Sequence, residues 1–239
     1  MGRADLHIHT KASDGLLSPR DVVEYAATET DLNVIAITDH DTLDGAWQAW
    51  RWLRAHPAVR LELLWGVEMT AAWFRHLLFY WLDRPPRRLP RRLLPLPRLI
   101  AELRETGAVC VAAHPANLLS LAGPEVRALA ARGFAPDALE ACNPAMGRRR
   151  EPGVRQLAKE LGLGLTGGSD AHGFRATIGA AYTEFPGCSR QHLFAALQEH
   201  ATGAGWHPTP VHTPLRVLAR QIQRAWLTKP GLLQRPREQ

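Results

Sequence analysis

The sequence predicts an α/β fold in which helices cover a mostly parallel sheet or barrel. Apolar segments of strand length alternate with segments that have a helical apolar face, and this alternation is typical of strand–helix–strand units. The length of 239 residues suits one large α/β domain or two small ones. Polar residues directly follow several strand-like segments, and in a parallel barrel the C-terminal strand ends meet on one face.

The chain opens with a predicted strand over residues 4–9, followed by a helix. Because side chains alternate along a strand, His7 and His9 point to the same face. There the two imidazoles could hold a metal ion or simply face solvent. Ser18 is a favoured N-cap residue and Pro19 suits the first helical position, so the helix is expected to start here.

A second strand is predicted over residues 34–38, a short apolar run. It delivers Asp39 and His40 at its C-terminal end. A helix over residues 44–55 follows, and we expect its tryptophans to pack on the rest of the domain.

Two further strands, over residues 60–67 and 76–82, are separated by a short connection. Glu68 comes at the end of the first strand and His76 at the start of the second. If the two strands form a hairpin, His76 lies at the level of Glu68. The stretch from 84 to 98 is rich in Pro and Arg and is expected to be a linker or loop.

The second half of the chain repeats the alternation. The expected helices cover residues 97–106, 124–132, 153–161 and 190–199, and the expected strands cover 108–113, 138–142, 164–168 and 182–185. Of these strands, the first delivers His114, and the third delivers Asp170 and His172.

We expect one domain over residues 1–205 and a basic C-terminal tail over residues 206–239. Prolines between 208 and 214 interrupt the chain before a last helix, whose apolar stripe starts at Leu215 and lies opposite arginines. This stripe packs on the domain or, as a less favoured use, contacts a partner or a membrane surface.

The net charge of +6 is concentrated in two basic stretches, 83–92 and 216–239. A local positive field could attract anionic substrates, nucleic acid or a membrane surface, but the preference for Arg over Lys could equally reflect the base composition of the genome. Three scattered cysteines make neither a disulfide framework nor a CxxC motif. With no signal-peptide pattern and no apolar run of membrane-spanning length, the expected location is the cytoplasm.

Ten polar residues at the expected strand ends form the candidate site. Imidazoles and carboxylates without thiolates suit Zn²⁺, Mn²⁺ or Fe²⁺, and their number exceeds what one tetrahedral ion uses, which indicates two or three metal ions. Such a cluster makes hydroxide available near neutral pH and binds the oxygens of a phosphoryl group. The ten residues are His7, His9, Asp14, Asp39, His40, Glu68, His76, His114, Asp170 and His172.

Six short motifs in this order closely resemble those of the PHP (polymerase and histidinol phosphatase) superfamily of metal-dependent phosphoesterases. The resemblance covers about residues 4 to 200 and implies a distorted TIM-like (β/α)7 barrel with the metal site at the C-terminal strand ends. The motifs are His7-Ile8-His9, Ser13-Asp14-Gly15, Thr38-Asp39-His40-Asp41-Thr42, Gly66-Val67-Glu68, Ala113-His114-Pro115 and Gly168-Ser169-Asp170-Ala171-His172.

The resemblance also implies a trinuclear site in which Glu68 bridges two ions. Its three ligand sets would be His7, His9, Glu68 and Asp170; Glu68, His76 and His114; and Asp14, His40 and His172. A carboxylate has two oxygens and can bind one metal through each, which independently supports the bridging role. Asp39 alternates away from His40 along its strand and is expected to orient a ligand rather than to bind metal.

We therefore expect a phosphoesterase in which a metal-bridging hydroxide attacks phosphorus and Glu68, Asp14, His40 and Asp170 are the catalytic positions. The sequence around Asp14 resembles the branch of the superfamily that acts on nucleotides and RNA 5′ ends, so the expected substrate is a small phosphorylated molecule, such as a nucleotide or short RNA or DNA. Arg75, Arg148 and Arg175 are candidates for binding phosphate.

Three alternatives stay open at this point. A metal-dependent amidohydrolase also uses an HxH strand, later histidines and an aspartate in a barrel. A small-molecule phosphatase similar to histidinol phosphatase would use the same centre. A nucleic-acid-binding accessory module would use the basic stretches and retain only a vestigial site. The sequence predicts neither the choice among Mn, Zn and Fe nor the oligomeric state.

Overall fold

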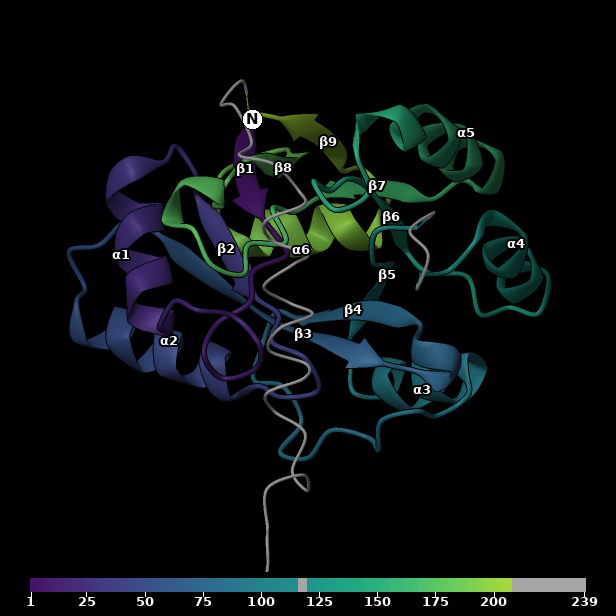
Figure 1. Ribbon diagram of the computed structural model, residues 1–239, viewed down its shortest axis with the longest axis horizontal. Helices are drawn as coiled ribbons and strands as arrows, with labels where there is room; N and C mark the ends of the chain where they lie inside the picture. Colours follow the sequence, from purple (N-terminus) through teal and green to yellow (C-terminus); the bar gives the residue numbers. More distant parts are fainter. Residues whose placement is uncertain (116–119, 208–239) are drawn as a thin grey trace, which may run out of the picture.

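The computed structural model describes residues 1–115 and 120–207 (Figure 1). The expected helix with its apolar stripe, and the basic tail from residue 208 onward, lie outside the described residues. Within the described part, no helix is both long enough and apolar enough to cross a bilayer.

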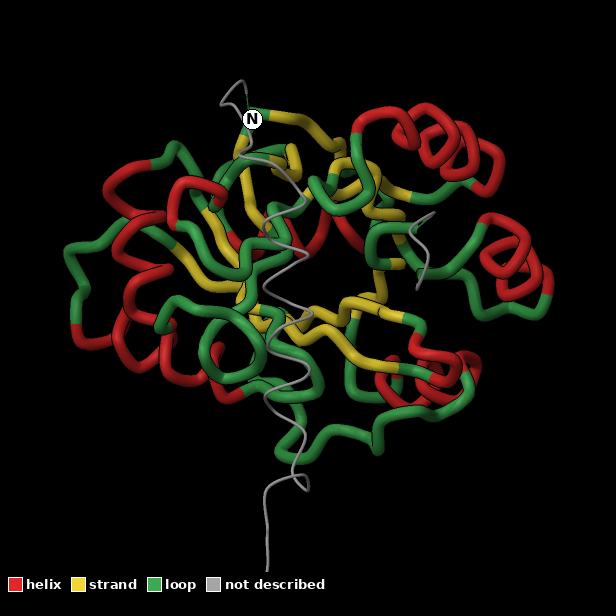
Figure 2. Tube along the Cα trace, viewed as in Figure 1, coloured by secondary structure: helices red, strands yellow, loops and turns green. Residues whose placement is uncertain are grey.

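Nine strands in the described part form one sheet that curves into a barrel (Figure 2). The order is β7-β6-β5-β4-β3-β2-β1-β8-β9. The end strand β7 also contacts β8 and β9, so the sheet nearly closes on itself. The strand bounds are β1 Gly2–Asp5, β2 Val34–Ile37, β3 Glu62–Thr70, β4 His76–Trp81, β5 Val109–Ala112, β6 Ala138–Cys142, β7 Gly164–Gly167, β8 Ala181–Phe185 and β9 Gly203–Trp206.

Five of the six described α-helices surround this sheet, whereas α6 lies across the opening of the ring of strands (Figure 1). The start of α1 agrees with the sequence, because Ser18 and Asp21 form a reciprocal capping box with Pro19 in the first turn. The helix bounds are α1 Pro19–Glu29, α2 Asp44–Ala55, α3 Leu96–Arg104, α4 Gly123–Ala131, α5 Glu151–Leu161 and α6 Arg190–Gln198.

The barrel has two apolar cores, one on each face of its sheet. The outer core lies between the strands and the surrounding helices, while the inner core joins inward strand residues to the buried face of α6. Along β3 and β4 the inward positions change from apolar to polar, from Leu64 to Glu68 and from Tyr80 through Leu78 to His76. One end of the barrel is therefore filled with side chains, and the other end carries the candidate site.

The sheet is more mixed than the alternation predicts. Pairs β1–β2, β2–β3, β5–β6 and β6–β7 are parallel, whereas β1–β8, β3–β4, β4–β5 and β8–β9 are antiparallel. The expected hairpin accounts for part of this difference, since β4 returns directly from β3.

Two details of the strands differ from the sequence-based expectation. The first strand is regular only over Gly2–Asp5, after which Ile8 makes an isolated parallel bridge with Ala171. Strand β9 is missing from the expectation because two of its four residues are glycine, and it extends one residue past the expected domain end at 205. Pairing with β8, rather than strand propensity, defines it.

Candidate metal centre

Glu68 lies at the centre of a cluster of imidazoles. Its side chain is 1% exposed, and its two oxygens face different histidines. Oε2 lies 3.2 Å from His7 Nε2 and 3.1 Å from His9 Nε2, while Oε1 lies 3.2 Å from both His76 Nδ1 and His114 Nε2. The carboxylate can thus bind one ion through each oxygen.

The register of the β3–β4 hairpin brings His76 to Glu68. Leu78 is directly opposite Glu68, and His76 is opposite Thr70. Since His76 is two residues from Leu78, it faces the same side of the hairpin and reaches Glu68 diagonally.

Asp170 closes the first group of donors beside His7 and His9. Its Oδ1 lies 3.6 Å from His7 Nε2 and 3.4 Å from His9 Nε2. Two backbone hydrogen bonds hold the segments together: the N–H of Asp170 donates to His7 O, and the N–H of His9 donates to Ala171 O, at 2.8 and 3.0 Å. These bonds therefore hold residues 7–9 and 170–171, which are far apart in the sequence, at one site.

Asp14 lies beside three imidazoles on the more open side of the cluster. Its Oδ2 lies 3.3 Å from His172 Nε2 and 3.8 Å from His40 Nε2, and its Oδ1 lies 3.6 Å from His9 Nδ1. The side chains of Asp14 and His40 are 40% and 25% exposed, so solvent reaches the cluster from here.

Two of the predicted ligands have unusual backbone conformations. His114 and Asp170 have φ values of 30° and 51°, in a region that residues with a side chain seldom adopt. Backbone strain of this kind persists where the surrounding structure fixes it, and it is concentrated at functional sites.

The donor set fits divalent metal ions. His, Asp and Glu donor atoms form four overlapping groups in which all atoms lie within 4.8 Å of one another. Among the described side chains, the buried nitrogens His9 Nδ1, His40 Nδ1 and His172 Nε2 make no hydrogen bond. Buried polar atoms are rarely left without a hydrogen bond, whereas imidazole nitrogen is an ordinary ligand of Zn, Fe and Mn.

Mutual electrostatics set the charges of the metal-free cluster. Burial would raise the pKa of Glu68, but the imidazoles around it, His40 and His76 first, hold it well below its usual range. Burial would lower the pKa of His9, but Asp170 and Glu68 raise it to about 10. Against the pull of Glu68, burial lowers the pKa of His40 to about 4. Glu68 is thus ionised, while His9 carries a proton that a metal ion would displace.

Glu140, on β6, is a site residue that the sequence-based reasoning missed. Its Oε1 lies 3.0 Å from His7 Nδ1, and its Oε2 accepts hydrogen bonds from the N–H of His114 at 2.7 Å and from Asn143 Nδ2 at 2.9 Å. Such a carboxylate fixes the tautomer and orientation of a metal-binding histidine. The available signal was a single acidic residue within an apolar strand, Ala138–Cys142.

A glycine makes room for this arrangement. A Cβ atom on Gly168 would lie 2.3 Å from His7 Cβ and 2.7 Å from Glu140 Oε1. The glycine of the last motif therefore permits the backbone before Asp170 to approach both side chains.

Asp39 holds the loop that carries Asp14. Its Oδ1 accepts hydrogen bonds from the N–H of Thr10 at 2.7 Å and from Ser13 Oγ at 2.6 Å, and its Oδ2 accepts one from Thr10 Oγ1 at 2.7 Å. Its contacts thus position a loop rather than the ring of a histidine.

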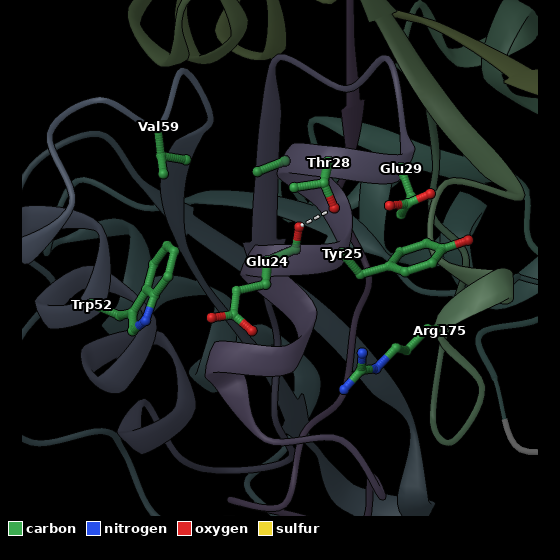
Figure 3. Close-up of a pocket in the computed structure, with 8 residues that line it drawn as sticks. Glu24, Tyr25, Thr28, Glu29, Trp52, Val59 and Arg175 are labelled. Carbon is green, nitrogen blue, oxygen red and sulfur yellow. Dashed lines mark hydrogen bonds between the residues drawn. The ribbon is translucent and has the colours of Figure 1, made fainter.

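The three arginines proposed to bind phosphate have partners elsewhere. Arg75 forms an ion pair with Glu125 at 3.0 Å, and the guanidinium of Arg148 lies over the Trp206 ring at 4.9 Å. Arg175 pairs with Asp21 and lines a surface pocket together with side chains of α1 and α2 (Figure 3). Their role in binding phosphate stays a prediction.

Comparison with protein families agrees with this geometry. The PHP domain model matches residues 5–127, which is more than half of the chain. The chain belongs to the PHP family. A second model, described as PHP-associated, matches residues 153–202, so both halves of the barrel have counterparts within the PHP family.

Curated relatives match about a third of this PHP chain. The 5′-3′ exoribonuclease Rnm of Salmonella typhimurium is 44% identical over 72 residues, which are 30% of this chain and 24% of the relative. A 3′,5′-nucleoside bisphosphate phosphatase of Chromobacterium violaceum is 38% identical over 78 residues, 32% of this chain and 25% of the relative. The match thus spans about a quarter of each relative.

Solved structures confirm the PHP fold over most of the chain. A two-domain protein from Bacteroides vulgatus that contains a predicted PHP-like metal-dependent phosphoesterase has a TM-score of 0.68 at 20% identity, covering 92% of this chain and 69% of that one. An amidohydrolase from Chromobacterium violaceum has a TM-score of 0.63 at 17% identity, covering 85% and 97%. At these identities the likeness shows the fold alone.

Proposed function

We propose that this PHP chain is a metal-dependent phosphoesterase that hydrolyses a phosphate ester of a nucleotide or short nucleic acid. The observation that carries the proposal is the position of Glu68, whose two oxygens face two separate sets of imidazoles. Oε2 faces His7, His9 and His40, and Oε1 faces His76 and His114. A structural zinc site uses about four ligands and would leave the other donors without a role.

We propose the three ligand sets that the family resemblance implies, filled by two or three ions of Mn, Zn or Fe. They are His7, His9, Glu68 and Asp170; Glu68, His76 and His114; and Asp14, His40 and His172. When bound, such ions lower the pKa of water and offset charge on a phosphoryl group.

The protein's own residues orient this donor set. With a proton on Nδ1, His7 donates to Glu140 Oε1 and directs the lone pair of Nε2 toward Glu68 and Asp170. Asp14 and His40, at the exposed side of the cluster, are the donors that a substrate phosphate reaches first. The proposed catalytic positions remain Glu68, Asp14, His40 and Asp170.

The substrate class rests on the relatives, whose names specify an exoribonuclease and a nucleoside bisphosphate phosphatase. We propose that residues 1–205 form the phosphoesterase domain and residues 206–239 a basic tail. The arginines proposed to bind the substrate phosphate are Arg75, Arg148 and Arg175. We propose a cytoplasmic location. Amide hydrolysis is the competing activity, and parallel screening of amides and phosphate esters separates the two.

The decisive experiment compares Glu68→Ala with the wild type and with Glu102→Ala, a carboxylate on the surface of α3. Metal content of the purified proteins and phosphate release from mononucleotides, nucleoside bisphosphates, short RNAs and histidinol phosphate are measured. We expect Glu68→Ala to lose both metal and phosphate release, and Glu102→Ala to keep both. A Glu68→Ala protein with wild-type metal content and rate would overturn the proposal.

A further inference from the structure

The turn between β3 and β4 carries two exposed aromatic side chains that the metal centre does not use. Trp73 is 84% exposed and Phe74 is 57% exposed, and Leu93 beside this turn is 47% exposed. Large apolar side chains gathered on a surface are characteristic of interaction sites. This set, Trp73, Phe74 and Leu93, is called the aromatic turn below.

The aromatic turn belongs to the same end of the barrel as the metal centre. The turn directly follows the end of β3 at Thr70 and precedes His76, whose ring contacts Glu68 (Figure 1). Leu93 is tied to it by a hydrogen bond from its N–H to Thr70 O at 2.7 Å. Trp73 precedes His76 by three residues, so their Cα atoms lie within about 11 Å of each other, a distance that a nucleotide with its phosphate at Glu68 can span.

The backbone of the aromatic turn is held in an unusual conformation. Trp73, Phe74 and Leu93 have φ values of 61°, 57° and 63°, in the left-handed region that is unfavourable for bulky residues. Hydrogen bonds fix the turn, from Ala71 N–H to Arg75 O at 2.7 Å and from Ala72 N–H to Leu94 O at 2.8 Å. Strain that the structure maintains is typical of ligand-binding segments, and a fixed turn presents the rings with little loss of backbone freedom on binding.

Positive charge accompanies these rings. Arg92 is adjacent to Leu93, has a 63% exposed side chain and lies 3.6 Å from Asp41, which follows His40 in the chain. Proteins that hold single-stranded nucleic acid combine positive charge along the backbone with aromatic side chains on which the bases stack.

We propose that the aromatic turn binds a nucleobase of the substrate by stacking on Trp73, while the attached phosphate lies at the metal centre. This inference rests on the proposed phosphoesterase function and makes the substrate a nucleotide or single-stranded nucleic acid rather than a phosphorylated sugar or amino alcohol. Arg92 contributes charge to the adjoining phosphate, and its contribution decreases with salt.

The test compares a substrate that contains nucleobases with a sugar phosphate that contains none. KM and kcat are measured for a 5′-phosphorylated dinucleotide and for ribose 5-phosphate, with wild type, Trp73→Ala, Trp73→Tyr and Trp52→Ala. Loss of a stacked base weakens binding about tenfold, so we expect Trp73→Ala to raise KM for the dinucleotide by about tenfold. Trp73→Tyr should restore most of that loss, and KM for ribose 5-phosphate should not change.

Trp52→Ala is the matched control, since this tryptophan lies on α2 (Figure 3) and stacks on His56. It should leave both substrates unaffected. An unchanged KM for the dinucleotide in Trp73→Ala would overturn the stacking proposal, as would an equal rise in KM for ribose 5-phosphate.

A binding measurement separates this proposal from the proposed function. Fluorescence anisotropy of a labelled single-stranded tetranucleotide gives Kd without turnover. We expect Kd to rise about tenfold for Trp73→Ala, even if no ester is hydrolysed, in which case only the proposed activity fails. Equal Kd for wild type and Trp73→Ala would overturn the stacking proposal whether or not the protein is a phosphoesterase.

Discussion

Glu140 connects two parts of the metal centre that are far apart in the sequence. One of its oxygens faces His7 Nδ1 and the other accepts from the backbone N–H of His114. Its side chain is 1% exposed, so water cannot replace these contacts. Removing its charge should therefore disturb the orientation of both ligands without removing a ligand.

We expect Glu140→Gln to weaken metal binding by about 10- to 100-fold, the effect that is usual for residues that orient metal ligands. The amide can accept from His114 N–H but supplies no negative charge to His7. Competition with a chromogenic chelator measures the affinity, and Glu184→Gln, a change on β8, is the control. The same metal affinity in Glu140→Gln and wild type would contradict the orienting role.

The proposed ligands could be selected individually, because each has the chemistry of a metal ligand and lies in or next to a segment of strand length. Glu140 could not be found in this way, since it lies inside a strand and its role depends on a contact with His7 across 133 positions of sequence. The partners of Arg75, Arg148 and Arg175 were equally inaccessible, because neighbours in sequence do not specify which carboxylate or ring a long side chain reaches in the fold.

At the scale of elements, the short-range signals were the most informative. The β3–β4 hairpin follows from two apolar segments with a short connection, and its register delivers His76 to Glu68. Strand β9, Gly203–Trp206, has no such signal in its sequence. It is a strand because it pairs with β8. The antiparallel position of β8 beside β1 likewise depends on how distant strands pair in the sheet rather than on local sequence.

The N-terminus of α1 gives a prediction that isolates a local element from the site. Ser18 Oγ accepts from the N–H of Asp21 at 3.1 Å. We expect Ser18→Ala to lower the free energy of unfolding by about 1 kcal/mol, because a helix N–H loses its acceptor. Urea denaturation measures the change, and Ser18→Asn, which preserves a cap acceptor, should recover most of it.

Metal affinity should be the same in Ser18→Ala and wild type, since the ligands on the neighbouring loop are held separately by Asp39. A loss of metal comparable to that of Glu140→Gln would show that α1 and the site are coupled.

At the scale of the whole molecule, the metal centre joins segments from His7 to His172, and the inner core with α6 closes the other end of the barrel. Metal ions bound here would link segments that belong to or follow six of the nine described strands, namely β1, β2, β3, β4, β5 and β7. Because a ligand that binds only the folded state stabilises it by mass action, an ion at one hundred times its Kd contributes about 2.7 kcal/mol.

We therefore expect a chelator to lower the melting temperature of the wild type by several degrees, and Mn²⁺ or Zn²⁺ to restore it. Glu68→Gln should start from a changed melting temperature and show little response to either addition. Differential scanning calorimetry measures both effects. A wild-type melting temperature that is independent of chelator and metal would contradict the proposal that the ions link these segments.

The stabilisation of the fold by bound metal ions should increase with pH. Nearby carboxylates raise the pKa of His9 to about 10 in the metal-free cluster, so at neutral pH this imidazole carries a proton that must leave before its lone pair can bind a metal ion. Raising the pH from 6 toward 9 favours the deprotonated ligand, and the metal-induced increase in melting temperature should grow over this interval.

Titration calorimetry in buffers of different ionisation enthalpy should detect proton release on metal binding. Proton uptake, or a metal-induced shift that shrinks as the pH rises, would show that the imidazoles are not the groups that the ions engage.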